Sequence, residues 1–192
     1  MKKVEIKEIV ENKEPKFVKT ELVKAERDGV PFLWERIKSH DSVHVLIDNM
    51  EAGEIIVVEQ VRVPVLCNDA SQDGRVTEAC AGLVDKDKGI AEIAREEILE
   101  ECGFDVPLDG IKFLKTLKSS VGTAGTESHA FIAEVTNDMK VSDGGGLAEE
   151  DINVVRIKYE DINDYFFNSD IHTDAITMFL ITFWMLYHTS MD

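Results

Sequence analysis

The sequence has little positive charge: 21 Lys and Arg face 38 Asp and Glu, which gives a formal net charge of −17 over 192 residues. A protein that binds DNA or RNA needs a basic surface to displace counterions from phosphates, so nucleic acid is not an expected partner. An anionic membrane surface is disfavoured for the same reason. A small anionic substrate remains compatible, because divalent cations or local Arg and Lys side chains can offset the field.

Cysteines and long apolar runs are also scarce. Cys67, Cys80 and Cys102 form no C-x-x-C pair, so neither a disulfide framework nor a zinc site is expected, and a reducing compartment is the simpler interpretation. Residues 1–16 alternate charges and lack the apolar core of a signal peptide. The longest apolar run, 175–187, is too short to span a bilayer. We therefore expect a soluble cytoplasmic protein without a membrane partner.

Familiar nucleotide and nucleophile motifs are missing as well. Neither G-x-G-x-x-G nor G-x-x-x-x-G-K-[ST] occurs, so dinucleotide-binding and P-loop interpretations lack support. The Ser119-Ser120 pair has no G-x-S-x-G context, which disfavours a serine hydrolase.

What is present is an ordered pattern of strands and two helices. Apolar alternation and β-branched runs predict strands at 4–10, 17–29, 42–48, 54–65, 75–83, 111–117, 128–135 and 152–159. Helices are expected at 90–102, with Gly103 at the position after the helix, and at 174–188. The second helix is apolar nearly all round, which predicts burial in the domain or in a partner subunit. The strands do not alternate regularly with helices, so a mixed α/β fold is expected rather than a doubly wound sheet.

The helix at 90–102 carries carboxylates on its apolar side. At about 100° per residue, Glu97 and Glu101 fall on the same side as Ile93 and Ile98, and Glu100 lies at its edge. An unpaired carboxylate facing a core is costly, and like charges four residues apart repel. A divalent cation such as Mg²⁺ resolves both problems, since hard cations prefer carboxylate oxygens. The alternative is a solvated acidic helix whose spacing is accidental.

Residues 82–104 resemble the signature of the Nudix hydrolases, G-x5-E-x7-R-E-U-x-E-E-x-G-U, where U is aliphatic or aromatic. The matching positions are Gly82, Glu97, Ile98, Glu100, Glu101, Gly103 and Phe104. Two positions depart from it: Lys88 stands at the first glutamate, and Glu96 stands at the arginine that helps to hold the metal-binding glutamates. Arg95 is adjacent but points about 100° away, so it is a poor substitute.

The resemblance extends over about residues 30–160. The segments "EQVRVPV" and "EACAGLVD" look like the ADP-ribose and nucleoside diphosphate sugar pyrophosphatase branch, and three further segments look most like UDP-sugar diphosphatases. This implies an α/β (α+β) fold, the Nudix α/β/α sandwich with a mixed sheet. It also implies a dimerising N-terminal β segment (1–40) before the Nudix domain (41–192), and a homodimer.

The resemblance implies Mg²⁺-dependent hydrolysis of the diphosphate of a nucleotide sugar, with Mn²⁺ as a possible substitute. UDP-glucose, giving UMP and glucose 1-phosphate, is the first expectation; ADP-ribose is the second, and a non-hydrolytic nucleotide-binding module with a degenerate signature is the third. The implied metal ligands are Glu97, Glu101, Glu100 and the Ala81 carbonyl. The base is expected on the loop before the last strand, at Glu150 or Glu149, with Glu150 favoured by alignment.

Four further residues are expected at the substrate. Trp34 and Glu35 match a pair that reads the base in related enzymes, although Trp34 could equally be a core or dimer-interface aromatic. Arg62 matches a strand arginine that faces phosphates, and its alternative is a surface ion pair. Glu127 lies in a loop that approaches substrate and metal in this branch.

Overall fold

The computed structural model describes residues 3–15, 18–68, 73–147 and 150–189. Its centre is a seven-stranded sheet in the order β5-β4-β3-β8-β7, to which β6 is added on β3 and β9 on β4. The strands are β3 (Ser42–Asn49), β4 (Glu54–Val61), β5 (Arg75–Glu78), β6 (Cys80–Leu83), β7 (Ile111–Ser119), β8 (Thr126–Val135) and β9 (Asn153–Lys158). β3 and β8 run parallel and the other pairs antiparallel, so the sheet is mixed.

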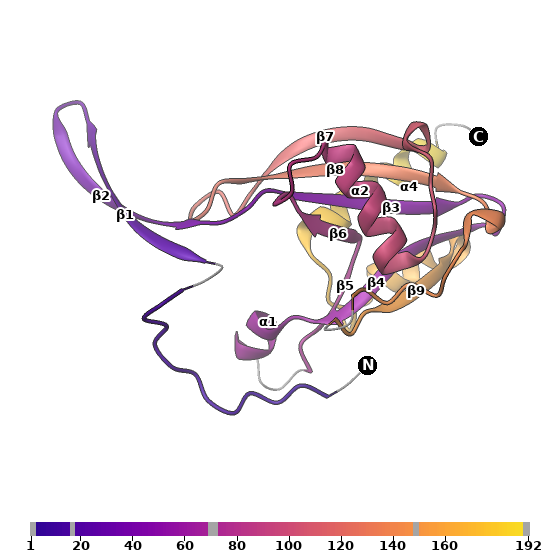
Figure 1. Cartoon of the computed structure of the whole chain (residues 1–192), viewed down its shortest axis with the longest axis horizontal. Coiled ribbons are helices and arrows are strands. Elements are labelled where there is room, and N and C mark those ends of the chain that lie inside the picture. The colour runs from indigo at the N-terminus through magenta and orange to yellow at the C-terminus, as the bar shows by residue number, and fades with distance from the viewer. Residues whose placement is uncertain (1–2, 16–17, 69–72, 148–149, 190–192) are drawn as a thin grey trace.

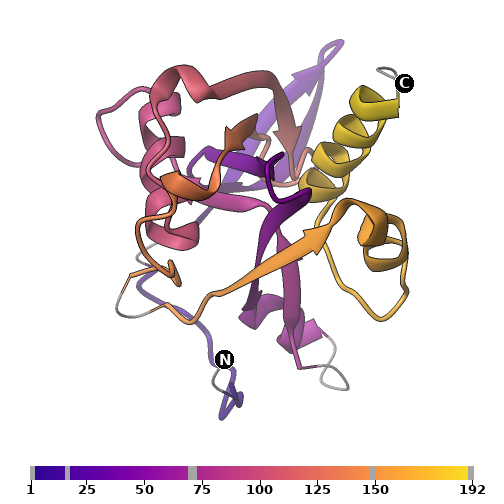
Figure 2. The same cartoon turned by 90° about the vertical axis from the view of Figure 1, so that its right-hand side faces the viewer.

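Helices cover both faces of this sheet (Figure 2). One face packs against α2 (Ile90–Glu97) and the π-helical turn η1 (Ile98–Cys102), and the other against α3 (Ile162–Phe166) and α4 (Ala175–Thr189). Along β3, Val45 and Ile47 belong to the α2 core while Leu46 belongs to the α4 core, because successive strand side chains point to opposite faces. The predicted α/β/α sandwich with a mixed sheet is therefore confirmed.

A separate hairpin precedes the sheet. Strands β1 (Lys19–Arg27) and β2 (Val30–Lys38) form a two-stranded sheet of their own and project from the body of the molecule (Figure 1). The turn at Asp28-Gly29 has positive φ at both residues, the backbone that a tight hairpin requires. At the base of the hairpin, the Ile37 N–H donates to the carbonyl of Thr123 in the β7–β8 loop, at 2.9 Å.

Several expected boundaries were wrong. Residues 4–10 form no strand, because their alternating pattern has no neighbouring strand to pair with. The expected strand 54–65 ends at Val61, and the short helix α1 (Val63–Asn68) follows, since Pro64 has no N–H for a ladder. The expected strand 75–83 is divided between β5 and β6. Strand β2, helix α3 and three short 3₁₀ turns were not predicted; the turns are η2 (Leu108–Gly110), η3 (Asn137–Met139) and η4 (Tyr159–Asp161).

Candidate active site

Strand β6 forms a floor beneath the acidic helix. Gly82 pairs with Val43 of β3 on the face that α2 covers, and the Glu97 side chain lies directly on Gly82. A Cβ at position 82 would occupy the same space as the Glu97 carboxylate. Glycine is therefore required here by close approach, and its absence of a side chain fixes where the carboxylate of Glu97 rests.

The neighbouring carboxylate, Glu101, is buried. Glu101 belongs to η1 and is 5% exposed. Its Oε2 accepts a hydrogen bond from the N–H of Ala81 at 3.0 Å. Two adjacent residues of β6 thus meet two carboxylates of the helix: Ala81 contacts Glu101 and Gly82 contacts Glu97. This arrangement explains why the helix can place charged groups on its sheet-facing side.

Both carboxyls have shifted pKa values. Burial raises the pKa of Glu97 to about 7, with Glu100 adding repulsion, while Lys86 acts in the opposite direction. Burial also raises the pKa of Glu101 to about 7, against the favourable hydrogen bond from Ala81. A cluster of carboxylate oxygens that burial and mutual repulsion make hard to ionise is a donor set suited to a hard divalent cation.

A glycine-rich loop is docked on the end of this helix. The N–H of Gly145 donates to the Glu101 carbonyl at 2.8 Å, and the N–H of Gly146 donates to the Glu100 carbonyl at 3.1 Å. Gly144 has φ +74°, and a Cβ there would collide with the Glu101 carbonyl. Residues 144–146 therefore provide hydrogen-bond donors for carbonyls that the end of the helix leaves unpaired. This contact was not predicted from the sequence.

The same loop brings Glu150 towards the helix carboxylates. Its Oε2 accepts a hydrogen bond from the N–H of Leu147 at 2.7 Å. Its charge contributes to raising the pKa of both Glu97 and Glu101, after burial as the main cause. Of the two predicted loop glutamates, Glu150 lies against Gly146, which is hydrogen-bonded to the Glu100 carbonyl, and Glu149 lies outside the described residues.

Arg62, which follows β4, pairs with a carboxylate of its own. Its Nε lies 2.8 Å from Oε2 of Glu78, the last residue of β5, which is largely buried. Burial raises the pKa of Glu78, and the Arg62 guanidinium counteracts that rise. The ion pair that was the alternative for Arg62 is present, and it also orients the guanidinium group.

A second set of potential ligands lies at the start of β3 and β8. One ligand atom from each of Asp41, Glu127 and His129 falls within 4.8 Å of the others, an arrangement that suits a cation. The N–H of Glu127 donates to Oδ1 of Asp41 at 2.7 Å, and the Glu127 carboxylate pairs with Lys118 at 2.6 Å. Glu127 therefore belongs to this cluster, which sequence reasoning did not assemble because its members are far apart in the chain.

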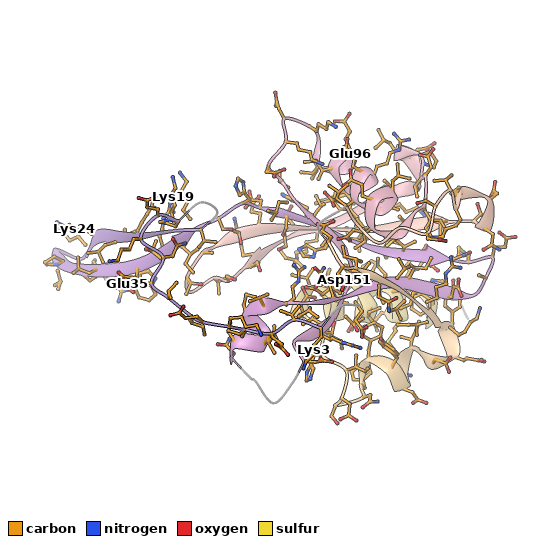
Figure 3. All side chains as sticks on the ribbon, turned by 60° about the horizontal axis from the view of Figure 1, so that its bottom comes forward. Lys3, Lys19, Lys24, Glu35, Glu96 and Asp151 are labelled. Atoms are coloured by element: carbon orange, nitrogen blue, oxygen red, sulfur yellow. The ribbon has the colours of Figure 1, made fainter. Side chains whose placement is uncertain are left out.

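The two residues expected at the base, Trp34 and Glu35, are on the projecting hairpin. Figure 3 shows Glu35 on the hairpin, far from the part of the molecule that carries Glu96 and Asp151. As neighbours on β2, Trp34 and Glu35 point to opposite faces of the hairpin. The indole N–H of Trp34 donates to the Gly122 carbonyl at 3.1 Å. Within one chain, neither residue is brought to the acidic helix.

Comparisons with known proteins agree with this geometry. The chain is 31% identical over 172 residues to the uridine diphosphate glucose pyrophosphatase NUDT14 of Mus musculus, covering 76% of this chain and 78% of the relative. It is 38% identical over 116 residues to the GDP-mannose pyrophosphatase of Enterobacter sp. (strain 638), covering 60% of this chain and 59% of the relative. No family model matches the chain.

The chain belongs to the Nudix hydrolases. The predicted enzyme class, a Nudix hydrolase of acid anhydrides, is confirmed with it. A solved structure entitled "Crystal structure of ADP compounds hydrolase" matches with a TM-score of 0.72 at 18% identity, over 93% of this chain and 90% of that one. That likeness confirms the fold of this Nudix hydrolase.

The residues at the two departures from the Nudix signature contact each other. Lys88 and Glu96 form an ion pair, and Lys86 Nζ lies 3.1 Å from the other oxygen of Glu96. The charges are exchanged relative to the signature, but the opposition of charge between positions 88 and 96 is kept. Arg95 points away as expected: it binds Asp105 at 2.7 Å and the Val106 carbonyl at 2.8 Å.

A cavity of about 830 Å³ in this Nudix hydrolase lies away from the acidic helix. It is on the α4 side of the sheet, and its lining includes Asp48, Leu114, Tyr159 and Trp184. In the described part of the chain, no helix is long and apolar enough to cross a membrane. Glu97, Glu100 and Glu101 are not among the residues that line this cavity.

Proposed function

We propose that this Nudix hydrolase cleaves the diphosphate of a nucleoside diphosphate sugar, with UDP-glucose as its preferred substrate and UMP and glucose 1-phosphate as products. The observation that carries the proposal is the placement of Glu97 and Glu101 against Gly82 and Ala81. The 31% identity over most of the chain to a UDP-glucose pyrophosphatase supports the choice of substrate.

The residues present fit a Mg²⁺ ion, with Mn²⁺ as a substitute. Glu97, Glu100, Glu101 and the Ala81 carbonyl would hold it, all hard oxygen donors. When bound, the ion supplies charge neutralisation on the diphosphate and a lower pKa for a water molecule. The buried position of Glu101, with the Ala81 N–H as a neutral donor, supports this assignment because a cation would offset its charge.

Glu150 is proposed as the general base. Its carboxylate takes a proton from the attacking water as the water oxygen bonds to one phosphorus and the bridging P–O bond breaks. The bridging oxygen leaves with the other phosphate, and the proton passes from Glu150 to solvent. The docking of residues 144–146 on η1 supports this role, because it ties the loop that carries the base to the helix that carries the ligands.

Four residues would bind the substrate. Arg62, oriented by Glu78, would face a phosphate, because a guanidinium offers several donors in a fixed fork. Glu127 would contact the sugar or a cation from the cluster with Asp41. Trp34 and Glu35 would contact the base only if the hairpin reaches a second subunit.

That condition leads to a homodimer in which segment 1–40 exchanges between copies and 41–192 forms the catalytic domain. Val23 and Trp34 face each other across the hairpin and remain more than a third exposed, at 37% and 54%. Exposed apolar side chains on a projecting hairpin suit an interface with a second copy. Light scattering on the purified chain tests this; a monomer at micromolar concentration would contradict it.

GDP-mannose is the second candidate, favoured by the 38% identity to a GDP-mannose pyrophosphatase over a shorter stretch. ADP-ribose, giving AMP and ribose 5-phosphate, follows. A non-hydrolytic module predicts saturable nucleotide binding without turnover, and the retained carboxylate arrangement counts against it.

The test is a panel of UDP-glucose, GDP-mannose and ADP-ribose with Mg²⁺ or with EDTA, and chromatographic identification of the products. The highest kcat/KM is expected for UDP-glucose, with UMP and glucose 1-phosphate released only when metal is present. A higher kcat/KM for GDP-mannose or ADP-ribose would make that compound the proposed substrate. Nucleotide binding without cleavage at high enzyme concentration would contradict the proposed hydrolase activity and favour the non-hydrolytic module.

A further inference from the structure

Two lysines of the loop between β6 and α2 converge on one glutamate of the helix. Lys86 Nζ lies 3.1 Å from Oε2 of Glu96, and Lys88 Nζ contacts its Oε1. The Glu96 side chain is 31% exposed, so the pairs are partly shielded from water. Glu96 immediately precedes Glu97 in the chain, and the contact therefore ties the loop to the helix beside the carboxylate cluster.

This loop continues directly from the floor of the site. The N–H of Ala81 binds Glu101, and Gly82 supports Glu97. Strand β6 pairs with β3 over its whole length, from Cys80 to Leu83, and the N–H of Val84 donates to the Asp41 carbonyl at 2.8 Å. Beyond Val84 the chain leaves the sheet, and the ion pairs of Glu96 join this segment to the helix.

The other described cations near the helix have different partners. Arg95 binds Asp105 and the Val106 carbonyl, and Lys140 donates to the Cys102 carbonyl at 2.8 Å. Lys86, in contrast, also interacts favourably with Glu97 and Glu100, after Glu96 as its main partner. An ammonium group that Glu96 holds at this place lies at the edge of the carboxylate cluster.

We propose that Glu96 is a positioning residue: through Lys86 and Lys88 it holds the 84–89 loop against α2, so that β6 and the helix present Glu97 and Glu101 together to a divalent cation. The inference rests on the proposed function for its metal. Because an ion pair needs only opposite charges, exchanging the charges of Lys88 and Glu96 preserves the pair between these two positions, while the contact of Lys86 with position 96 is lost.

The experiment compares Lys88→Glu, Glu96→Arg and the double variant that carries both changes. Mn²⁺ affinity is measured by the EPR signal of free Mn²⁺, and kcat and KM are measured with the best substrate of the panel. Each single change is expected to weaken Mn²⁺ binding and kcat about 10-fold, the scale typical of residues that support metal ligands, with KM little changed. The double variant, which restores the pair between positions 88 and 96, is expected to recover part of both losses.

The matched control is the partly exposed ion pair that Arg95 of the same helix makes with Asp105, beyond the end of η1. Arg95→Gln and Asp105→Asn should leave Mn²⁺ affinity unchanged. The milder Lys88→Gln and Glu96→Gln serve where charge reversal prevents folding, which circular dichroism reports.

The proposal is overturned if single changes leave Mn²⁺ affinity intact, if the double variant is no better than the single variants, or if the controls lose as much. If the Mn²⁺ pattern holds but no nucleotide sugar is cleaved, the proposed function fails and the positioning role stands.

Discussion

Two buried carboxylates lie on opposite faces of the same sheet and have opposite kinds of neighbours. Asp48, on the α4 face, is 3% exposed and is surrounded by donors: the Tyr159 hydroxyl, the Trp184 indole N–H at 2.8 Å and His188 at 3.3 Å. Glu101, on the α2 face, is 5% exposed, is bound by the N–H of Ala81, and has carboxylates for neighbours.

The difference is the one expected between a structural charge, Asp48, and a proposed metal ligand, Glu101. A buried carboxylate with several donors is stabilised by the fold itself. A buried carboxylate that faces others lowers the stability of the metal-free fold, and such arrangements are typical of sites that bind a cation. Burial alone therefore does not distinguish a proposed metal ligand from a structural carboxylate; the charge of the surrounding groups does.

The largest expected effect follows from removing the functional charge. Glu101→Gln should lower kcat by roughly 100-fold or more, because even residues behind metal ligands typically cost 10–100-fold. Circular dichroism should show a retained fold, since the amide keeps nearly the same shape. Asp48→Asn is the matched control on the other face, with activity near wild type. Near-normal turnover of Glu101→Gln would remove Glu101 from the metal site.

The next effect concerns the structural charge. Asp48→Ala leaves the Tyr159 hydroxyl and the Trp184 N–H without their acceptor, and each buried unsatisfied group costs about 1–3 kcal/mol. We expect the free energy of unfolding to fall by about 3 kcal/mol in urea titrations, while kcat per folded molecule is unchanged. A loss of kcat without a loss of stability would contradict the division between the two faces.

A smaller effect tests the floor of the site. Gly82→Ala places a methyl group where the Glu97 carboxylate rests, and we expect a roughly 10–100-fold loss of kcat, as for residues that support metal ligands. Gly122→Ala is the control, because a Cβ there meets nothing within 4 Å. Equal activity of the two variants would show that Glu97 can move without cost.

Sequence reasoning could propose a metal site at Glu97 and Glu101 because its evidence is local. Glu97 and Glu101 are four residues apart, so a helical wheel places them together, and the Nudix signature covers a continuous segment. The alternation along 42–48 similarly identified a strand. What failed were segments whose structure depends on distant partners: residues 4–10 alternate as a strand would, but no neighbouring strand is there to pair with them.

The supports of the site were harder to predict for the same reason. The π-helical turn at 98–102 and the docking of Gly145 on the Glu101 carbonyl depend on contacts across more than forty residues. Lys88 and Glu96 looked like two separate departures, because the loop that lets them meet is irregular. The Asp48 cluster draws on α4, more than a hundred residues away.

The smallest expected effect is the pH dependence of the metal-free fold. The pKa values of Glu97 and Glu101 are raised to about 7, chiefly by burial, from an ordinary value near 4.5. The folded state therefore binds protons more tightly than the unfolded state, so this contribution to stability is fully present below about pH 4.5 and is lost as pH rises towards 7. Glu101→Gln removes one such group, so in EDTA its stability relative to wild type should rise by roughly 2 kcal/mol from pH 5 to pH 8, since this window covers most of the rise from 4.5 to about 7 and one pKa unit corresponds to about 1.4 kcal/mol. Thermal unfolding of both proteins at the two pH values measures this difference in stability, and Mg²⁺ should reverse it at pH 8. If both proteins have the same pH profile, the Glu101 carboxylate is stabilised by its hydrogen bonds, as Asp48 is.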